Sequence, residues 1–414
     1  MMAAAAIAAA GCASAPQKPA APAPIMARGV AAIEPAADPR PFGAGDTAFG
    51  LDVLGAWCAQ DPDQNLVFSP STLATALGMA YLGARGSTAQ AMAKVLHLPV
   101  TSAAALAAGL QARSKALGGL DSPGVTLAAS NQVWADPSLP PLHTYLNAVA
   151  TGYDAGVAKA PFATNPQQAA NEINQYISAA TRGHIPQLVT PDMLANGIGW
   201  VLTSALYMNA AWQSPFDPNK TGPGSFTLAG GKQVTAKFMN GDGYSFATAG
   251  GWDAVSLPYK GGKLTMTALL PPSGAGTCAL PSDTALRTLT AALGAGKTDN
   301  AVSLPKVSLS VNGSLGDMKS VLQRLGMGQA FTDAADFTGL SKQACCIGFV
   351  QQAAMLQVGE KGTVGAAAVA VGAVASSAQV EAHMVVFDRP YLMLVTDTAT
   401  GEPLFLAKVA DPAA

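Results

Sequence analysis

The run V-G-E-K-G-T-V-G-A-A-A-V-A-V-G-A-V-A-S-S-A-Q-V-E-A-H, residues 358–383, decides how the rest of the chain is interpreted. It carries no charge between Lys361 and Glu381 and almost nothing larger than Val. An ordinary Ala/Val run is usually a buried strand or helix. Here Gly365 and Gly372 disfavour a helix, and a single strand of this length would far exceed the usual five or six residues. A long apolar loop inside a compact domain is usually functional. We interpret the run as a loop suited to becoming a strand.

The composition indicates a globular chain and excludes several functions. Half of the 414 residues are hydrophobic and only 12% are charged, so much of the surface must be small and neutral. The 23 Lys and Arg nearly balance the 25 Asp and Glu without a basic stripe, which argues against a nucleic-acid partner. The four His and five Cys show no metal-ligand spacing, so neither a metal nor a cofactor is expected. No interior linker is evident, which leaves one large domain or two fused lobes open.

The first residues resemble an export signal. In residues 1–12 an apolar Ala-rich run leads to Ala9-Ala10-Gly11-Cys12, similar to a lipobox in which Cys12 would be lipidated, although no Lys or Arg precedes the run. The alternative is an Ala-rich tail without function. Residues 13–44 are rich in Ala and Pro and predict an extended tether. We expect an exported protein, extracellular or in the cell envelope, that meets a membrane only through this lipid anchor.

Hydrophobic periodicity places helices mainly early and strands mainly late, which predicts an α+β fold. The first helix is expected to begin near Asp46 as N-cap and to end near Cys58. Further helices are expected from Leu73, over 169–180 and over 318–325. Strands are expected over 66–68, 125–134, 199–207, 253–259, 264–270, 302–311, 385–397 and 404–409, and the run 199–207 should be buried on both faces.

Several motifs resemble those of the serpins, a family of serine protease inhibitors. E-K-G-T (360–363) before the Ala-rich run resembles the hinge of the serpin reactive loop, and F-D-R-P-Y (387–391) with G-E-P-L-F-L-A-K-V (401–409) resembles the C-terminal signature. N-L-V-F-S-P-S (65–71), A-Y-L-G-A-R-G-S-T (80–88), T-R-G-H-I (181–185) and L-Y-M-N-A-A-W (206–212) resemble further family motifs. They occur in family order over roughly residues 45–412, so the chain is identified as a member of this family.

The resemblance implies a single serpin domain, residues 45–414, with three β-sheets, eight or nine helices and an exposed reactive loop at about 360–382. It implies an inhibitor rather than an enzyme. A target serine protease would cleave the loop and become acyl-linked to it, and the freed half of the loop would then insert into the central sheet. The partner would be that protease, bound covalently by a monomer.

The resemblance also assigns site residues. The hinge would be Glu360, Lys361, Gly362, Thr363, Val364, Gly365, Ala366, Ala367 and Ala368, and the cleaved bond would join Ser376 to Ser377. Trp212 would lie in the breach beneath the loop's entry point, and Ser69, Ser71, Ser204 and Gln352 would form the shutter where the central strands part. The small residues around the cleaved bond favour an elastase-like or subtilisin-like protease over a trypsin-like one.

The sequence departs from the family pattern at four of these positions. Val364 and Gly365 stand where inhibitory members usually carry Glu and Ala, and Ser204 and Gln352 replace the usual Asn and His. Gly365 weakens strand preference, which favours slower insertion and keeps a non-inhibitory member, cut as a substrate or used for binding, as the alternative. A hydrolase is disfavoured because no G-x-S-x-G motif is present. Cys58, Cys278, Cys345 and Cys346 are expected to be buried small hydrophobes, with a disulfide among them as the alternative.

Overall fold

The computed structural model describes residues 24–99, 102–195, 200–295, 300–311, 317–343, 345–363 and 384–414. Cys12, the hinge positions 364–368 and the Ser376–Ser377 bond lie outside these residues. The helices are α1 (Arg40–Cys58), α2 (Pro70–Gly83), α3 (Gly86–Val95), α4 (Ala103–Gly118), α5 (His143–Tyr153), α6 (Pro166–Ala180), α7 (Pro191–Leu194), α8 (Asp283–Ala295) and α9 (Lys319–Leu322), with short turns η1 (Pro218–Lys220), η3 (Gln323–Met327) and η4 (Gly328–Phe331).

The strands come from the whole length of the chain. They are β1 (Met26–Ala27), β2 (Leu66–Phe68), β3 (Val125–Ala135), β4 (Val157–Lys159), β5 (Trp200–Ala211), β6 (Gly222–Thr227), β7 (Gln233–Ala249), β8 (Trp252–Pro258), β9 (Leu264–Leu270), β10 (Asn300–Pro305), β11 (Val307–Val311), β12 (Phe349–Gly359), β13 (Gly362–Thr363), β14 (Met384–Val386), β15 (Tyr391–Asp397) and β16 (Pro403–Val409). The α+β class is confirmed.

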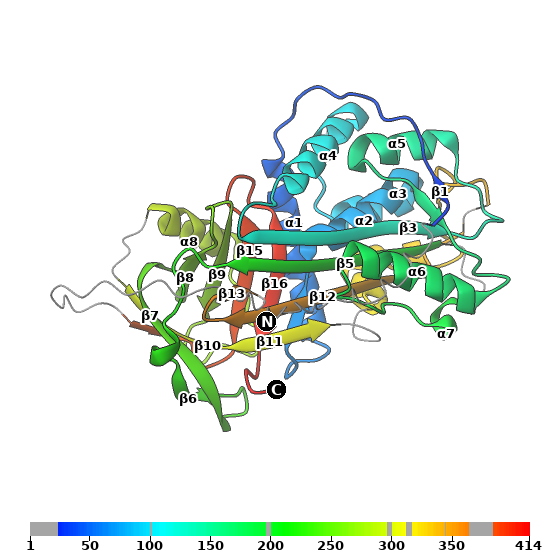
Figure 1. Ribbon diagram of the computed structural model, residues 1–414. Helices are drawn as coiled ribbons and strands as arrows, with labels where there is room; N and C mark the ends of the chain where they lie inside the picture. The colour runs from blue at the N-terminus through cyan, green and yellow to red at the C-terminus, as the bar shows by residue number, and fades with distance from the viewer. Residues whose placement is uncertain are drawn as a thin grey trace, which may run out of the picture.

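The strands form three sheets, as expected. The central sheet has the order β1-β4-β3-β5-β13-β12-β11, and its long strands run across the middle of the molecule (Figure 1). The other two sheets share β7 and so form one continuous strand order, β14-β10-β7-β8-β9-β15-β16-β2, with β6 also paired to β7. The 17-residue strand β7 belongs to two sheets, because its first part pairs with β6 and β10 and its last part, from Ser245, pairs with β8.

Strand β5 is buried on both faces, which confirms the expectation for the apolar run at 199–207. Helix α2 packs on one side, so that Leu202 and Leu206 belong to the main core. On the other side Val201 and Ala205 join a second core with Ile173 of α6. A strand covered on both faces cannot alternate apolar and polar residues, which explains the continuous run. The central sheet is therefore the middle layer of the fold.

The strand expected over 302–311 is two strands in different sheets. β10 ends at Pro305, and β11 begins at Val307 in the central sheet beside β12. Proline has no N–H for a strand ladder and fixes its own φ, which suits the point at which the chain leaves one sheet for another. The helix expected over 318–325 is present but changes type: α9 ends at Leu322, the chain continues as the π-helix η3, and Gly326 then takes a φ of 107°.

The N-terminal boundary differs from the sequence prediction. Helix α1 begins at Arg40 with Pro39 at the N-cap, so Asp46 lies inside the helix. Part of the segment expected as a tether, from Met26 to Glu34, is attached to the domain by hydrogen bonds. Met26 and Ala27 pair with β4, and the backbone N–H groups of Val30 and Ala32 donate to side chains of α5 at 2.8 Å each. An Ala/Pro-rich segment can thus be fixed by backbone hydrogen bonds without burying a core of its own.

The cysteines also differ from the first expectation. Cys58 at the end of α1 and Cys278 before α8 form a disulfide across 220 residues of sequence. Cys345 and Cys346 are free thiols, and Cys345 is exposed rather than buried. The fold brings Cys58 and Cys278 together through contacts that no local pattern reveals, so the alternative of a disulfide is the one that holds for this pair.

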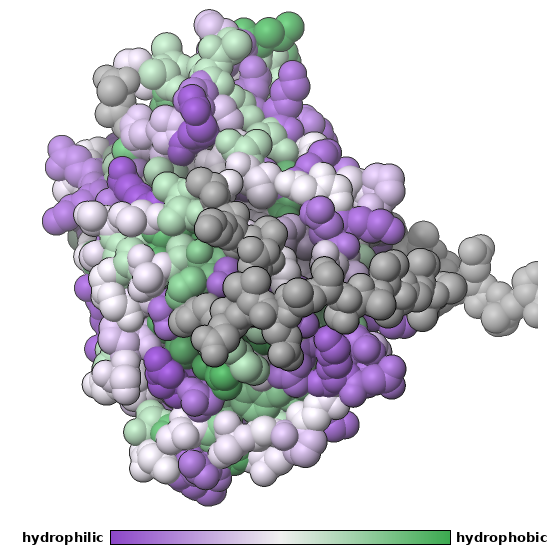
Figure 2. All heavy atoms as spheres, turned by 90° about the vertical axis from the view of Figure 1, so that its left-hand side faces the viewer, coloured by the Kyte–Doolittle hydropathy of each residue, from purple (hydrophilic) through white to green (hydrophobic). Residues whose placement is uncertain are grey.

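The surface mixes polar and apolar residues. On the face that carries β7 and β10, the visible described residues form small purple, white and green patches that alternate (Figure 2). Within the described ranges, none of the helices combines the length and the hydropathy that crossing a membrane requires.

Asp46 is buried because it belongs to an internal ion cluster. Arg113 of α4 is 3% exposed and donates to Asp46, to Glu402 at 2.5 Å, to the carbonyl of Ser71 at 2.9 Å and to Thr75 at 2.7 Å. Burial raises the pKa of Asp46 well above its usual range, more than Arg113 lowers it. Asp46 therefore keeps its proton to a higher pH than an ordinary carboxyl, which reduces the negative charge buried beside the guanidinium.

The cluster predicts a difference between two buried substitutions. Arg113→Met should lower the free energy of unfolding by about 3–5 kcal/mol, because it leaves buried acceptors without their cation. Asp46→Asn should cost much less, since an amide resembles the neutral form of the carboxyl that burial favours. Urea unfolding followed by circular dichroism measures both, with exposed Arg40→Ala as a control that should leave the midpoint unchanged. Equal losses for Asp46→Asn and Arg113→Met would contradict a raised pKa of Asp46.

Candidate functional site

The candidate site begins where β12 turns back into its own sheet. After Gly359 the chain turns at Glu360 and Lys361, and β13 runs antiparallel to both of its neighbours. Thr363 pairs with Val358 of β12 on one side and with Ala210 of β5 on the other. β13 therefore occupies the place of an additional strand between β5 and β12 (Figure 1).

Beyond β13 the two neighbouring strands close on each other. β12 pairs with β5 directly and in parallel, from Phe349 opposite Val201 to Ala354 opposite Leu206. At one end of the central sheet, β13 thus lies between β5 and β12, and along the rest these two strands pair with each other directly. A longer strand in the same place would have to separate β5 from β12 along this pairing.

Only glycine fits at position 362. Its φ is 148°, a conformation that side chains rarely adopt, and a Cβ there would lie 2.1 Å from the carbonyl oxygen of Ala210. The close approach of the two backbones is what allows β13 to pair with β5. Gly362 is therefore required by the geometry of this short strand.

Thr363 is the first side chain of β13 to enter the interior. It is fully buried, and its hydroxyl lies 2.5 Å from the hydroxyl of Tyr259. Burial raises the pKa of Tyr259 above its ordinary value, so the phenol stays protonated and can share this hydrogen bond. Tyr259 also stacks on Trp212, with ring centroids 4.5 Å apart.

Trp212 forms hydrogen bonds to the turn between β12 and β13. Its indole N–H donates to the carbonyl of Gly359 at 2.9 Å, and its backbone N–H donates to Lys361 at 3.0 Å. The backbone N–H of Phe216 donates to Glu360 at 2.8 Å. The segment after β5 thus satisfies the carbonyls that the turn would otherwise leave unpaired.

The Glu360 side chain makes a second anchor. Its carboxylate lies 2.9 Å from the ammonium group of Lys306 and accepts a hydrogen bond from Thr221 at 3.1 Å. Burial raises the pKa of Glu360, but the hydrogen bond from Lys306 and the remaining contacts outweigh it, so the pKa is lowered overall. The anchor is therefore ionised at neutral pH, whereas Lys361 next to it is exposed.

A buried polar cluster lies midway along the β5–β12 pairing. The Gln352 amide donates to the carbonyl of Ser69 at 3.0 Å and to the hydroxyl of Ser204 at 3.1 Å, and its oxygen accepts from the backbone N–H of Ser69 at 3.3 Å. Ser204 donates to Thr72 at 2.8 Å, and the hydroxyls of Ser69 and Ser71 lie 3.2 Å apart. The cluster joins both central strands to the start of α2.

Comparison with known proteins assigns the chain to a family. The model of the serpin (serine protease inhibitor) family matches residues 44–412. The chain belongs to the serpin family. Serine protease inhibitor 42Dd of Drosophila melanogaster is 30% identical over 82% of this chain and 89% of its own length. The leukocyte elastase inhibitor of Bos taurus is 28% identical over 89% of this chain and 99% of its own length. The crystal structure of Serpin48 from Tenebrio molitor superposes with a TM-score of 0.76 at 26% identity, over 89% and 98% of the two chains.

Most of the site residues predicted from the motifs, where the structure of this serpin describes them, lie close together. Glu360, Gly362, Thr363 and Trp212 lie around one turn, and the four shutter residues share one hydrogen-bonded cluster; their roles remain predictions. Residues that sequence analysis missed are Tyr259, Lys306, Thr221 and Thr72. Of these, only Thr72 had a local signal, since it follows the Ser69 N-cap by three residues.

The close approach at Gly362 predicts the effect of adding one methyl group. Gly362→Ala should release β13 from the sheet, because the clash with Ala210 adds to a backbone strain of about 1–3 kcal/mol. Amide hydrogen exchange over residues 355–363 should become about tenfold faster or more. Gly118→Ala is the matched control, since nothing lies within 4 Å of a Cβ at that position. Unchanged exchange in Gly362→Ala would contradict the described pairing.

The Glu360–Lys306 ion pair predicts a pH dependence. Because the pKa of Glu360 is lowered in the folded state, its anchoring contribution is present above the ordinary value of 4.5 and is lost as pH falls through the lowered pKa. The partly exposed pair contributes at most about 1 kcal/mol. Glu360→Gln should lower the protection factors of residues 358–363 at pH 7 to the level expected of wild type below the lowered pKa, once exchange rates are corrected for their intrinsic dependence on pH. Asp242→Asn, which removes an exposed ion pair with Lys220, should have no such effect.

Proposed function

We propose that this serpin inhibits a serine endopeptidase as a suicide substrate whose cleaved loop inserts between β5 and β12. The observation that carries the proposal is the position of β13, which already lies between these two strands at one end of the sheet. The sequence that continues from Thr363 is small and apolar through Ala370. Such a segment is suited to extend β13 into a packed interior without bulk or charge to bury.

The chemistry would be supplied by the protease. Its serine would attack the carbonyl carbon of Ser376, the amine of Ser377 would leave with a proton, and an acyl-enzyme would join Ser376 to the protease. Insertion would replace one parallel interface, β5 with β12, by two antiparallel ones, which pair slightly better per residue. The exchange would have to break the hydrogen bond between Gln352 and Ser204, so the shutter cluster would set part of the barrier.

The residues at the cleaved bond indicate the class of target. Val374, Ala375, Ser376 and Ala378 are all small, and neither Lys nor Arg occurs among them. A protease with a shallow, apolar primary pocket, elastase-like or subtilisin-like, would accept them better than one that needs a basic side chain. Export of a monomer through the N-terminal segment, with lipidation of Cys12, would place the inhibitor where such proteases act.

The second candidate is a non-inhibitory serpin that is cut as an ordinary substrate or has a binding role. It is favoured by Gly365, which adds backbone freedom two residues after the inserted Thr363. Slower insertion would let water hydrolyse the acyl-enzyme before the protease is trapped. Both candidates predict cleavage of the same bond. They differ in whether the protease stays covalently attached to Ser376.

Incubation with an elastase-like and a subtilisin-like protease distinguishes them. Inhibition predicts a complex that survives denaturing gels, together with a released C-terminal fragment that begins near Ser377. Cleavage at this bond with full remaining protease activity would support the second candidate and contradict the first for these enzymes. Mass spectrometry of the fragments identifies the bond.

A pair of hinge variants tests the insertion step itself. Thr363→Arg should be cleaved at the same bond but form at least about tenfold less complex, because a buried position against Tyr259 cannot accept a charge. Thr363→Val, of similar size, should retain most of the inhibition. If Thr363→Arg formed complex as well as wild type, insertion through β13 would be contradicted.

A further inference from the structure

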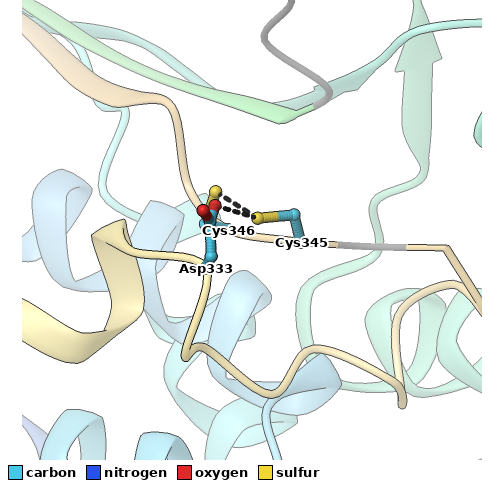
Figure 3. Close-up of side chains that lie close together, drawn as sticks. All are labelled: Asp333, Cys345 and Cys346. Atoms are coloured by element: carbon cyan, nitrogen blue, oxygen red, sulfur yellow. Dashed lines mark hydrogen bonds between the residues drawn. The ribbon is translucent and has the colours of Figure 1, made fainter.

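Three side chains that no step of the proposed function uses converge before the start of β12. Asp333 follows η4, and Cys345 and Cys346 lie on the segment that leads into β12. The Cys345 sulfur lies 3.2 Å from the Asp333 carboxylate and 2.7 Å from the Cys346 sulfur. Figure 3 shows the Cys345 side chain pointing at the other two, and their ligand atoms all lie within 4.8 Å of one another.

The fold holds the two segments of this cluster beside each other. The backbone N–H of Ile347 donates to Ala330 of η4 at 3.0 Å, and that of Gly348 donates to Trp200 of β5 at 3.1 Å. On the other side, Ala335 donates to Thr332 at 2.9 Å and closes a turn around Asp333. The convergence of the three donors therefore results from backbone hydrogen bonds and not only from a contact between flexible side chains.

Cys345 and Cys346 are free in a protein whose other described cysteines are paired in a disulfide. A disulfide between the two neighbours is disfavoured. None of the described peptide bonds is cis, so their Cα atoms are about 3.8 Å apart, below the usual disulfide range of about 4.4–6.8 Å. A metal ion can bind both sulfurs without that constraint.

We propose that Asp333, Cys345 and Cys346 form a binding site for a thiophilic divalent cation, of which Zn²⁺ fits best. Two thiolates and one carboxylate are ligands that Zn²⁺ accepts, whereas Ca²⁺ and Mg²⁺ require oxygen ligands alone. Three protein ligands leave the fourth tetrahedral position to water or to an external ligand. Binding releases two thiol protons to solvent, and the bound centre, with two thiolates and one carboxylate on Zn²⁺, carries a charge of about −1.

The geometry needs one small adjustment on binding. With Zn–S bonds of about 2.3 Å at tetrahedral angles, two thiolates on one zinc lie about 3.8 Å apart. The sulfurs must therefore move apart by roughly 1 Å from their present 2.7 Å. Cys345 is exposed and Cys346 is half-buried, so rotation about their Cα–Cβ bonds can supply this movement without repacking the core.

Titration of the full chain with Zn²⁺ tests the site. Calorimetry should show one Zn²⁺ per chain, bound about 100-fold more weakly or not at all in Cys345→Ser and Cys346→Ser, and about tenfold more weakly in Asp333→Asn. Co²⁺ should produce a thiolate charge-transfer absorption that disappears in the same cysteine variants. A matched control should bind as wild type does: Asp336→Asn changes a carboxyl in the same loop that accepts a hydrogen bond from Thr338 instead.

Three results would overturn the proposal. The first is equal Zn²⁺ affinity in wild type and the cysteine variants. The second is no binding by protein whose Cys345 and Cys346 thiols have been shown to be free. The third is a Cys345–Cys346 disulfide found by mass spectrometry in protein prepared with Zn²⁺ present, which would make the pair a redox couple instead. None of these measurements depends on protease inhibition, so they test the metal site independently of the proposed function.

Discussion

The parallel pairing of β5 with β12 is the interaction on which the rest of the structure depends. It closes the central sheet between two layers of helices, so both strands are buried and every backbone group in them needs a partner. The strands cannot part by a small amount, because each unpaired N–H or carbonyl would carry a desolvation cost. β13 shows how the sheet tolerates separation at one end, where an inserted strand supplies the missing partners on both sides.

The polar cluster around Gln352 has an unusual position for a hydrogen-bonded group in such a core. It lies in the middle of the pairing and joins β5, β12 and the start of α2 through side chains. An apolar layer would slide with little change in energy, whereas these hydrogen bonds must break together before the strands separate. Ser204 and Gln352, at the positions where we predict the usual Asn and His of the family, supply a hydroxyl and an amide to these hydrogen bonds.

Sequence analysis succeeded where the signal was local or carried by a motif. The apolar run at 199–207 predicts a strand buried on both faces, which β5 confirms. It failed where the partner is distant. Asp46 resembles an N-cap until Arg113, 67 residues later, is seen beside it, and Tyr259 meets Thr363 across 104 residues. The Cys58–Cys278 disulfide is another such pairing, which only the folded chain brings within bonding distance.

The two-residue strand β1 determines which way the molecule would face if it were held by its N-terminus. β1 joins the central sheet through β4 and β3 at the level of Val201 and Leu202, whereas β13 joins it at the level of Ala210 and Ala211. Nine strand residues separate these levels, a distance of about 30 Å. The chain thus enters the domain at the end opposite the hinge (Figure 1). A support that grips the N-terminal segment would therefore lie at the far end of the central sheet from the turn between β12 and β13, where Lys361 is exposed.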